Sequence, residues 1–420
     1  MRRGADEDVL GEGGRKRINA VDRERSSIMS CTVNNLSEYI AAIEENALYD
    51  CISRGEHRRY EAPLRSAILR KQTPECYDEL LQEYFSQFEA ELTDLQSKHF
   101  IAFSQHHGIP TNLLDFSKSP LVSLYFATEF CEDKGNVYFI KKSKLVDAGK
   151  LINSNPYGWG LLDDLLNFDI DTLRPIAHQL ARAFKRNSQE MVDFFILHTE
   201  EFIARYNHLY SMMDDHNVNA LKAALQTFLK DREEWDREPS LQVYSSYSNF
   251  VNSFFKVYRQ DEILFPQKTF ENYKKANSIA NTDLYEDGWP SVQLILLLMK
   301  FDVLIQFFDG YPFANTNKEI ELPFYFSYSP PMIDNRVRNQ SSIFVFQPFQ
   351  RDDYINGKDQ VRYWQRIAPD FEIKIENPES IQKELDAIGI NRKYIYCDYD
   401  NAAKYTIDYF FGEKQTGIRN

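Results

Sequence analysis

Cysteine is scarce in this sequence, and its spacing does not suit metal or disulfide chemistry. The chain of 420 residues has five cysteines, spread from Cys31 to Cys397, with no CxxC pair and no cysteine–histidine array. This pattern excludes the usual zinc sites and a disulfide framework, so we expect reduced thiols and no bound metal. The sequence also lacks a Gly-x-Ser-x-Gly motif and a Gly-rich phosphate loop, which argues against the common hydrolase and nucleotide-loop classes.

Basic residues are outnumbered. The chain has 49 Lys and Arg but 63 Asp and Glu, which gives a net charge of −14. This charge argues against a protein whose whole surface binds nucleic acid. Six basic residues nevertheless lie within eighteen positions of one another and could form one local basic cleft. These residues are Arg54, Arg58, Arg59, Arg65, Arg70 and Lys71.

Long apolar runs are absent too. The most apolar segment, residues 292–308, is interrupted by Gln293, Lys300 and Asp302, which predicts a buried helix rather than a membrane span. The N-terminus is charged and has no apolar core, so we expect no signal peptide, no membrane association and a cytoplasmic protein.

The sequence contains both segments with helical periodicity and short segments with strand patterns, which predicts an α+β fold with a mixed sheet core. We divide the chain into a disordered tail (1–32), two halves of one domain (33–150 and 316–412), a large helical insertion between them (151–315) and a final tail (413–420). Order is expected to begin at the Asn35–Glu38 capping-box spacing. Predicted strands are 47–53, 137–140, 322–327, 342–347, 371–375 and 394–397. Predicted helices include 73–103, 120–131, 175–185, 189–206, 219–230, 291–308, 381–388 and 401–411.

Residues 105–121 hold the densest group of polar side chains. The stretch begins Gln105-His106-His107-Gly-Ile-Pro-Thr111 and continues through Asp115 to Ser119-Pro120. Ser119 is a natural N-cap, and proline fits the first helical position, where no N–H is needed. We therefore predict a constrained loop that leads into a buried helix and holds polar side chains at a pocket wall.

Several motifs follow one another in a fixed order. They are Ser53-Arg54-Gly55-Glu56, the 105–117 stretch, Pro120-Leu-Val-Ser-Leu-Tyr-Phe-Ala127, the segment from Asn335 to Phe344, and the Tyr396–Asp400 stretch. In this order they resemble the FRG domain family, named for a Phe-Arg-Gly motif, over about residues 36–411 without the insertion. This sequence departs from the family at Ser53, Asn112, Phe116 and Ser117, which replace Phe, Arg, Trp and Thr.

The motif layout of that family is similar to the layout of ADP-ribosyltransferases. The resemblance therefore implies an ADP-ribosyltransferase-like mixed sheet, with NAD as the substrate. Several members occur in phage-defence and toxin–antitoxin settings. A toxin or phage-defence effector that modifies RNA, DNA or protein, with an antitoxin or chaperone as partner, is the implied role.

Catalytic roles are implied for Arg54, His106 and Gln340. Residues implied to bind NAD are Gly55, Glu56, Gln105, Thr111, Asp115, Tyr125 and Arg336. In this hypothesis Arg54 orients the phosphates, His106 and Gln340 hold the ribose, and Tyr125 stacks on the nicotinamide. The hypothesis requires that the segments near positions 54, 106 and 340 line one hollow.

Each assignment has a structural alternative. Arg54 could form an ion pair with Glu56 or Asp115, and Tyr125 could belong to the core. Thr111 and Asp115 could brace the loop. Gln340 cannot act as a general base, so a transferase would need one from Asp334, Glu56 or the target.

Two other functional classes stay open. One is a module that binds a nucleotide or nucleic acid without chemistry. The other is an interaction protein whose acidic helical insertion docks a partner.

Overall fold

The computed structural model describes residues 28–71, 76–130, 134–154, 161–167, 169–187, 190–191, 193–194, 197–198, 201–202, 267–279, 292–293, 295–296, 299, 319–331, 335–352 and 360–411. The strands are β1 (Met29–Val33), β2 (Cys51–Glu56), β3 (Leu113–Ser117), β4 (Asn136–Lys141), β5 (Leu145–Asp147), β6 (Glu319–Glu321), β7 (Tyr325–Tyr328), β8 (Ser342–Phe346), β9 (Phe349–Asp352), β10 (Gln360–Arg366) and β11 (Phe371–Ile375). The helices are α2 (Leu36–Glu45), α3 (Ala67–Arg70), α4 (Tyr77–Phe88), α5 (Asp94–Lys98), α6 (Phe100–His106), α7 (Pro120–Thr128), α8 (Gly149–Ser154), α9 (Leu161–Leu166), α10 (Ile170–Leu173), α11 (Ala177–Arg186), α15 (Gln267–Ile279), α17 (Asn335–Asn339), α18 (Pro378–Ala387), α19 (Arg392–Tyr396) and α20 (Tyr399–Phe411).

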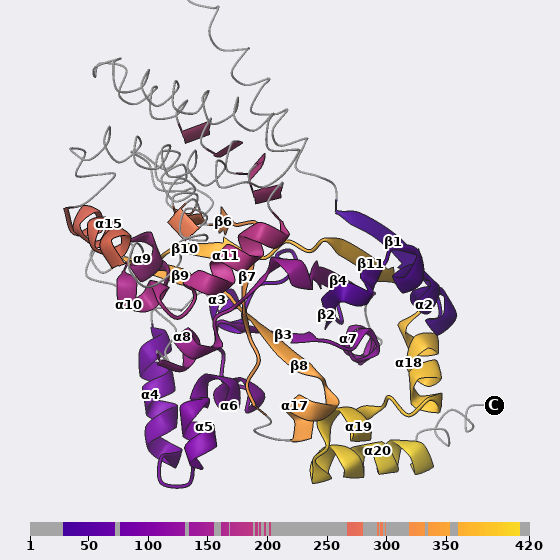
Figure 1. Cartoon of the computed structure of the whole chain (residues 1–420). Helices are drawn as coiled ribbons and strands as arrows, with labels where there is room; N and C mark the ends of the chain where they lie inside the picture. The colour runs from indigo at the N-terminus through magenta and orange to yellow at the C-terminus, as the bar shows by residue number, and fades with distance from the viewer. Residues whose placement is uncertain are drawn as a thin grey trace, which may run out of the picture.

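One large mixed sheet organises the molecule (Figure 1), in the order β1-β11-β4-β2-β3-β8-β7-β5. The outer pairs β1–β11 and β5–β7 are parallel, and the five inner pairings are antiparallel. A smaller sheet has the order β6-β10-β9. The predicted α+β fold with a mixed sheet is confirmed.

The pairing of β2 is strongly unequal on its two sides. It pairs with β4 along its whole length, but with β3 at a single position, Ser53 opposite Ser117. Beyond that position β3 pairs on its other side with β8. The two strands therefore separate in the middle of the sheet, which leaves polar groups there in need of other partners.

Strand β4, in the interior of the sheet, has apolar side chains at successive positions. Val137 and Phe139 pack in the core that α2, α7 and α18 cover, while Tyr138 and Ile140 pack in a second core with residues of β2, β3 and β8. Successive side chains point to opposite faces of a strand, so a strand covered on both faces is apolar at nearly every position.

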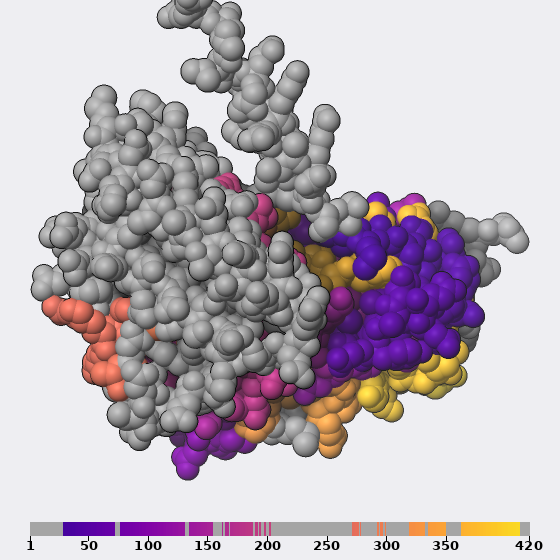
Figure 2. All heavy atoms as spheres, turned by 45° about the horizontal axis from the view of Figure 1, so that its top comes forward, coloured from indigo at the N-terminus to yellow at the C-terminus, as the bar shows by residue number. Residues whose placement is uncertain are grey.

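The first and the last strand of the described chain pair with each other at one edge of the large sheet. Residues 29–33 of β1 pair in parallel with residues 371–375 of β11, and Figure 2 shows indigo N-terminal and yellow C-terminal residues on one surface. The expected tail of residues 1–32 is therefore wrong from Met29 onward, because β1 is an ordered strand; residues 1–27 lie outside the described residues.

Several local predictions are confirmed and others are wrong. Asn35 caps α2 by accepting from the backbone N–H of Glu38, and the strand at 371–375 has its predicted bounds. The strand predicted at 394–397 is the helix α19, because Asn391 caps it through the N–H of Tyr394. The helix predicted over 73–103 consists of α4, α5 and α6.

The helical insertion is described only in part. Between residues 149 and 186 the described elements are the helices α8, α9, α10 and α11, and α15 is a further helix of this region. The helix predicted over 219–230 lies outside the described residues, and those over 189–206 and 291–308 lie partly outside.

Candidate functional site

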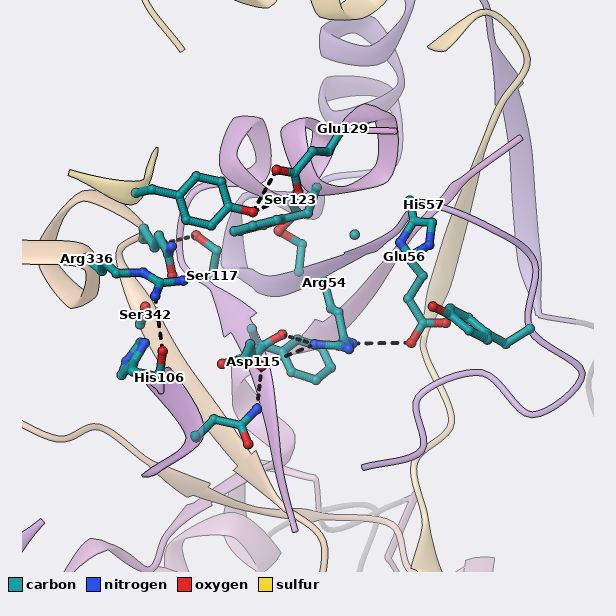
Figure 3. Close-up of a pocket in the computed structure, with 18 residues that line it drawn as sticks. Arg54, Glu56, His57, His106, Asp115, Ser117, Ser123, Glu129, Arg336 and Ser342 are labelled. Carbon is teal, nitrogen blue, oxygen red and sulfur yellow. Dashed lines mark hydrogen bonds and ion pairs between the residues drawn. The ribbon is translucent and has the colours of Figure 1, made fainter. Parts of the chain in front are cut away.

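A pocket of about 290 Å³ opens where β2 and β3 separate (Figure 3). Its walls come from β2, β3, the end of α6, one face of α7, α17 with the turn before β8, and the end of α19. Arg54, His106 and Gln340 all line it. The expected convergence of these three distant segments is therefore present, while the roles assigned to the residues stay predictions.

Arg54 bridges the gap between the two separated strands. Its Nη1 donates to the backbone carbonyl of Asp115 at 2.8 Å and lies 3.8 Å from Oδ2 of that residue. Its Nε donates to Glu56 Oε1 at 3.3 Å. The guanidinium thus satisfies a carbonyl of β3 that β2 does not reach, and both predicted ion-pair partners are in place.

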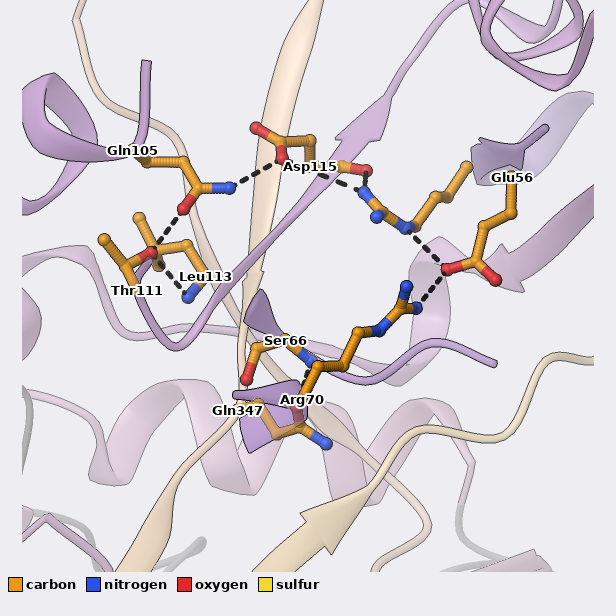
Figure 4. A network of polar contacts seen from close by, with 9 residues as sticks. Glu56, Ser66, Arg70, Gln105, Thr111, Leu113, Asp115 and Gln347 are labelled. Atoms are coloured by element: carbon orange, nitrogen blue, oxygen red, sulfur yellow. Dashed lines mark hydrogen bonds and ion pairs between the residues drawn. The ribbon is translucent and has the colours of Figure 1, made fainter. Parts of the chain in front are cut away.

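Glu56 is the most deeply buried charged group of the pocket wall, with a side chain only 1% exposed. Its Oε1 accepts from Arg54 and, at 2.8 Å, from Arg70 Nη2 (Figure 4). Its Oε2 is buried and has no hydrogen-bond partner among the residues that the structure describes. An unsatisfied buried acceptor costs about 1–3 kcal/mol, so a donor from water or from a ligand would stabilise this oxygen.

Gln105, Thr111 and Asp115 form one polar network (Figure 4). The amide of Gln105 donates to Asp115 Oδ2 at 2.7 Å and accepts from the Thr111 hydroxyl at 2.5 Å. Thr111 also accepts from the N–H of Leu113, is fully buried, and does not line the pocket. The Thr111 hydroxyl therefore braces the chain behind the pocket wall, as in the structural alternative, and its implied contact with NAD stays a prediction.

His106 ends a helix instead of lying on the predicted constrained loop. It is the last residue of α6, and the loop that follows is short because residues 113–117 form β3. The backbone carbonyl of His106 accepts from Arg336 Nη1 at 3.0 Å. Its ring packs edge-on against Phe344, with 5.6 Å between centroids. His106 and Arg336 both line the pocket.

Gln340 lies in the turn between α17 and β8 and is buried. Its Nε2 donates to the carbonyl of Ile395 at 3.3 Å, and its backbone carbonyl accepts from the Ser117 hydroxyl at 2.6 Å. These bonds connect the start of β8 with α19 and β3. The side-chain nitrogen is thus engaged with the main chain of the protein.

Tyr125 and Gly55, both implied to contact NAD, lie in different surroundings. Tyr125 is 2% exposed, belongs to the core beneath the sheet and does not line the pocket. Gly55 lines the pocket, but a Cβ there would lie 1.9 Å from the carbonyl oxygen of Ser123. Glycine is therefore needed for the close approach of β2 to α7, and it lies inside β2, beyond the end at residue 53 that was predicted for this strand.

The basic cleft that the sequence leaves open is only partly assembled, because Arg54 and Arg70 share Glu56 and the guanidinium groups of Arg58 and Arg70 lie over the ring of Tyr60. Of the six basic residues from Arg54 to Lys71, only Arg54 lines the pocket. Arg59 pairs with Glu376 at 3.5 Å, and Arg65 pairs with Glu319 at 2.6 Å. These pairings direct neighbouring arginines to separate places on the fold.

Sequence reasoning missed the face of α7 that borders the pocket. Ser123, Phe126 and Glu129 are spaced three residues apart and all line it. Their spacing was the available signal, because residues three apart share a helix face, whereas Tyr125 is turned about 100° from Phe126. Tyr396, which also lines the pocket, carried no such signal because a strand was expected there.

Neither a metal centre nor a membrane span is found in the part of the chain that the structure describes. Within the described ranges, no group of three or more His, Cys, Asp or Glu side chains is placed to hold a metal ion. No described helix has the length and apolar character needed to span a membrane.

The comparison with family models matches residues 50–135 to the FRG domain. The chain carries an FRG domain. The matched segment contains β2, β3 and α7, and with them Arg54, Glu56, Asp115 and Glu129. The opposite wall of the pocket, with Arg336, Gln340 and Tyr396, lies outside the match. Searches of curated proteins and of solved structures found no match.

Proposed function

We propose that the pocket binds NAD⁺ and that this FRG-domain protein is an ADP-ribosyltransferase. The observation that carries the proposal is Glu56, a buried carboxylate held by two arginines at the pocket wall, with its second oxygen lacking a partner among the described residues. Such a fixed negative charge stabilises positive charge that develops nearby, and a pre-oriented group costs no reorganisation during the reaction.

The charge and shape of the pocket support this ligand. Arg54 and Arg336 offer guanidinium groups to a diphosphate, which planar arginine forks bind well. Phe126 and Tyr396 add ring surface beside these polar groups. The volume of about 290 Å³ suits the nicotinamide–ribose part of the dinucleotide, with the rest lying outside.

In the proposed reaction the bond between nicotinamide and C1′ of the ribose breaks. Nicotinamide leaves with the bonding electron pair as a neutral molecule, and the sugar passes through an oxocarbenium-like state. The Glu56 carboxylate stabilises that cation, and a nucleophile of the acceptor forms the new bond to C1′. Glu56 thus supplies the carboxylate that Gln340 lacks.

The acceptor is nucleic acid or protein, and the net charge of −14 favours protein. In cells such an activity would make the protein a toxin or phage-defence effector that an antitoxin or chaperone restrains. Toxicity on expression, relieved by Glu56→Gln, is the expected cellular outcome. Equal toxicity of the variant would contradict this role.

The direct test incubates the full chain with labelled NAD⁺ and with RNA, DNA or lysate protein. We expect release of nicotinamide and labelling of one acceptor class, both reduced about 100-fold in Glu56→Gln. Glu372→Gln is the matched control, because Glu372 lies on β11 away from the pocket. Absence of nicotinamide release by the wild type with every acceptor would refute the proposal.

A second candidate function is binding of a nucleotide without turnover. It is favoured by Gln340, which has no ionisable group and whose Nε2 is held by Ile395. NAD⁺ binding without nicotinamide release in the same assay would support this alternative.

A further inference from the structure

A second buried carboxylate lies on the α7 side of the pocket. Glu129 directly follows the last residue of α7, and its side chain is 6% exposed. It lines the pocket together with Ser123 and Phe126 of the same helix face, and it points toward the pocket in Figure 3.

The Glu129 carboxylate is held by a hydroxyl rather than by a close ion pair. Tyr396 Oη donates to Oε1 at 2.7 Å and to Oε2 at 2.8 Å. Arg392 Nη2 is farther away, at 3.9 Å from Oε1. Each carboxylate oxygen can accept more than one hydrogen bond, so this arrangement leaves acceptor capacity for a further donor.

Tyr396 is fixed from both sides. Its ring lies 5.1 Å from the Arg336 guanidinium carbon and packs edge-on against Phe126. Burial, followed by the charge of Glu129, raises the pKa of the Tyr396 hydroxyl. The hydroxyl therefore keeps its proton and serves as a stable donor to the carboxylate.

Glu56 and Glu129 have different partners, which suits them to different tasks. Glu56 is bound by the guanidinium groups of Arg54 and Arg70. The main partner of Glu129 is a neutral hydroxyl, which can stay bonded to one oxygen while the other oxygen accepts a proton. Glu129 can thus change its protonation without breaking a close ion pair.

We infer that Glu129 accepts the proton of the nucleophile that attacks C1′, with Tyr396 as the residue that positions its carboxylate. This role rests on the proposed ADP-ribosyl transfer. The new bond forms between the nucleophile and C1′, the C1′–nicotinamide bond has given its electron pair to nicotinamide, and the proton of the nucleophile moves to a Glu129 oxygen. No other reactant is required.

The test compares nicotinamide release with transfer of labelled ADP-ribose to total lysate protein and RNA. Glu129→Gln should lower transfer about 100-fold and nicotinamide release less than about tenfold, since base catalysis acts on the attacking group. Tyr396→Phe, which keeps the ring, should lower transfer about tenfold. Glu379→Gln is the control, because Glu379 is 72% exposed and forms its ion pair with Lys383, one turn along the same helix.

Chemical rescue separates proton transfer from a structural role. Glu129→Ala should lose transfer and regain at least about tenfold of it when formate is added, because formate replaces the missing carboxylate. Transfer by Glu129→Gln at the wild-type rate would overturn the inference. The inference would also be overturned if Glu129→Gln lost transfer and nicotinamide release equally and formate did not rescue Glu129→Ala. Glu129 would then bind NAD⁺ or stabilise the fold.

The same assay separates this inference from the proposed function. A wild type that releases no nicotinamide refutes the transferase and, with it, the role of Glu129. A wild type that turns over NAD⁺ while Glu129→Gln transfers normally refutes the role of Glu129 alone.

Discussion

The two walls of the pocket are held by different kinds of interaction. The wall within the FRG domain is built on strands and held by charged side chains, with Arg54 between Glu56 and Asp115. The opposite wall is built on a turn and short helices. There Arg336 and Gln340 donate to the backbone carbonyls of His106 and Ile395.

From this difference we expect the first wall to carry the charge chemistry of the proposed reaction and the second wall to set the shape of the pocket. In the first wall, Arg54 is oriented both by Glu56 of its own strand and by the main-chain carbonyl of Asp115, 61 positions away. In the second wall, side chains hold the main chain of distant segments together. Substitutions in the first wall should therefore affect chemistry most, and those in the second should affect fit.

The largest expected effect is at Gly55, where the first wall meets α7. Gly55→Ala should destabilise the protein by about 3 kcal/mol, because the added Cβ meets a backbone carbonyl that cannot rotate away. Denaturant unfolding measures this change. The control is Gly108→Ala, with φ of +85° and open space around it, for which about 1 kcal/mol is expected. Equal losses at both sites would contradict the close-packing argument.

Arg54→Ala should lower NAD⁺ turnover about 100-fold, because it removes the charge that bridges the separated strands. Its stability should fall by no more than about 2 kcal/mol, since Arg70 still pairs with Glu56. Steady-state kinetics and thermal unfolding check both statements. Arg65→Ala, which breaks an ion pair outside the pocket, should keep turnover near that of the wild type. An Arg54→Ala protein that does not fold would indicate a structural role instead.

Gln340→Ala should lower turnover about tenfold, mainly through KM, because the bond to Ile395 that positions the second wall is lost. Asn339→Ala is the neighbouring control, since Asn339 also donates to a carbonyl of α19 but does not line the pocket. A loss confined to kcat, or an equal loss in the control, would contradict the division between the two walls.

Tyr125→Phe should change turnover by less than about twofold, because the ring lies in the core and not in the pocket. The comparison with Tyr396→Phe sharpens this statement, since that hydroxyl bonds to Glu129. Steady-state kinetics of the Tyr125→Phe and Tyr396→Phe variants, measured under the same conditions, check this prediction. A large loss in Tyr125→Phe would require that the core tyrosine reaches the ligand.

The sequence predicted the first wall better than the second for a physical reason. Arg54 and its two partners could be recognised because Glu56 is two residues away and Asp115 belongs to a distinctive motif. Strand β3 was missed because its Leu-Leu-Asp-Phe-Ser sequence is short, and both Leu113 and Leu114 are buried, so no alternation is visible. The strand becomes evident only through its pairing with β8.

The second wall depends on contacts that no local pattern encodes. The short helix α19 was taken for a strand, so Tyr396 was not placed at the pocket. The bond between Tyr396 and Glu129 joins residues 267 positions apart. Glu56 Oε2 likewise lacks a hydrogen-bond partner among the described residues because of burial in the assembled sheet and not because of its residue type.

The central claim is that the gap between β2 and β3 is an NAD⁺ site, and titration calorimetry with NAD⁺ tests it most directly. We predict saturable binding to the full chain, retained in Arg65→Ala and weakened at least about tenfold in Arg54→Ala. No binding to the wild type, or equal binding to Arg54→Ala, would contradict it.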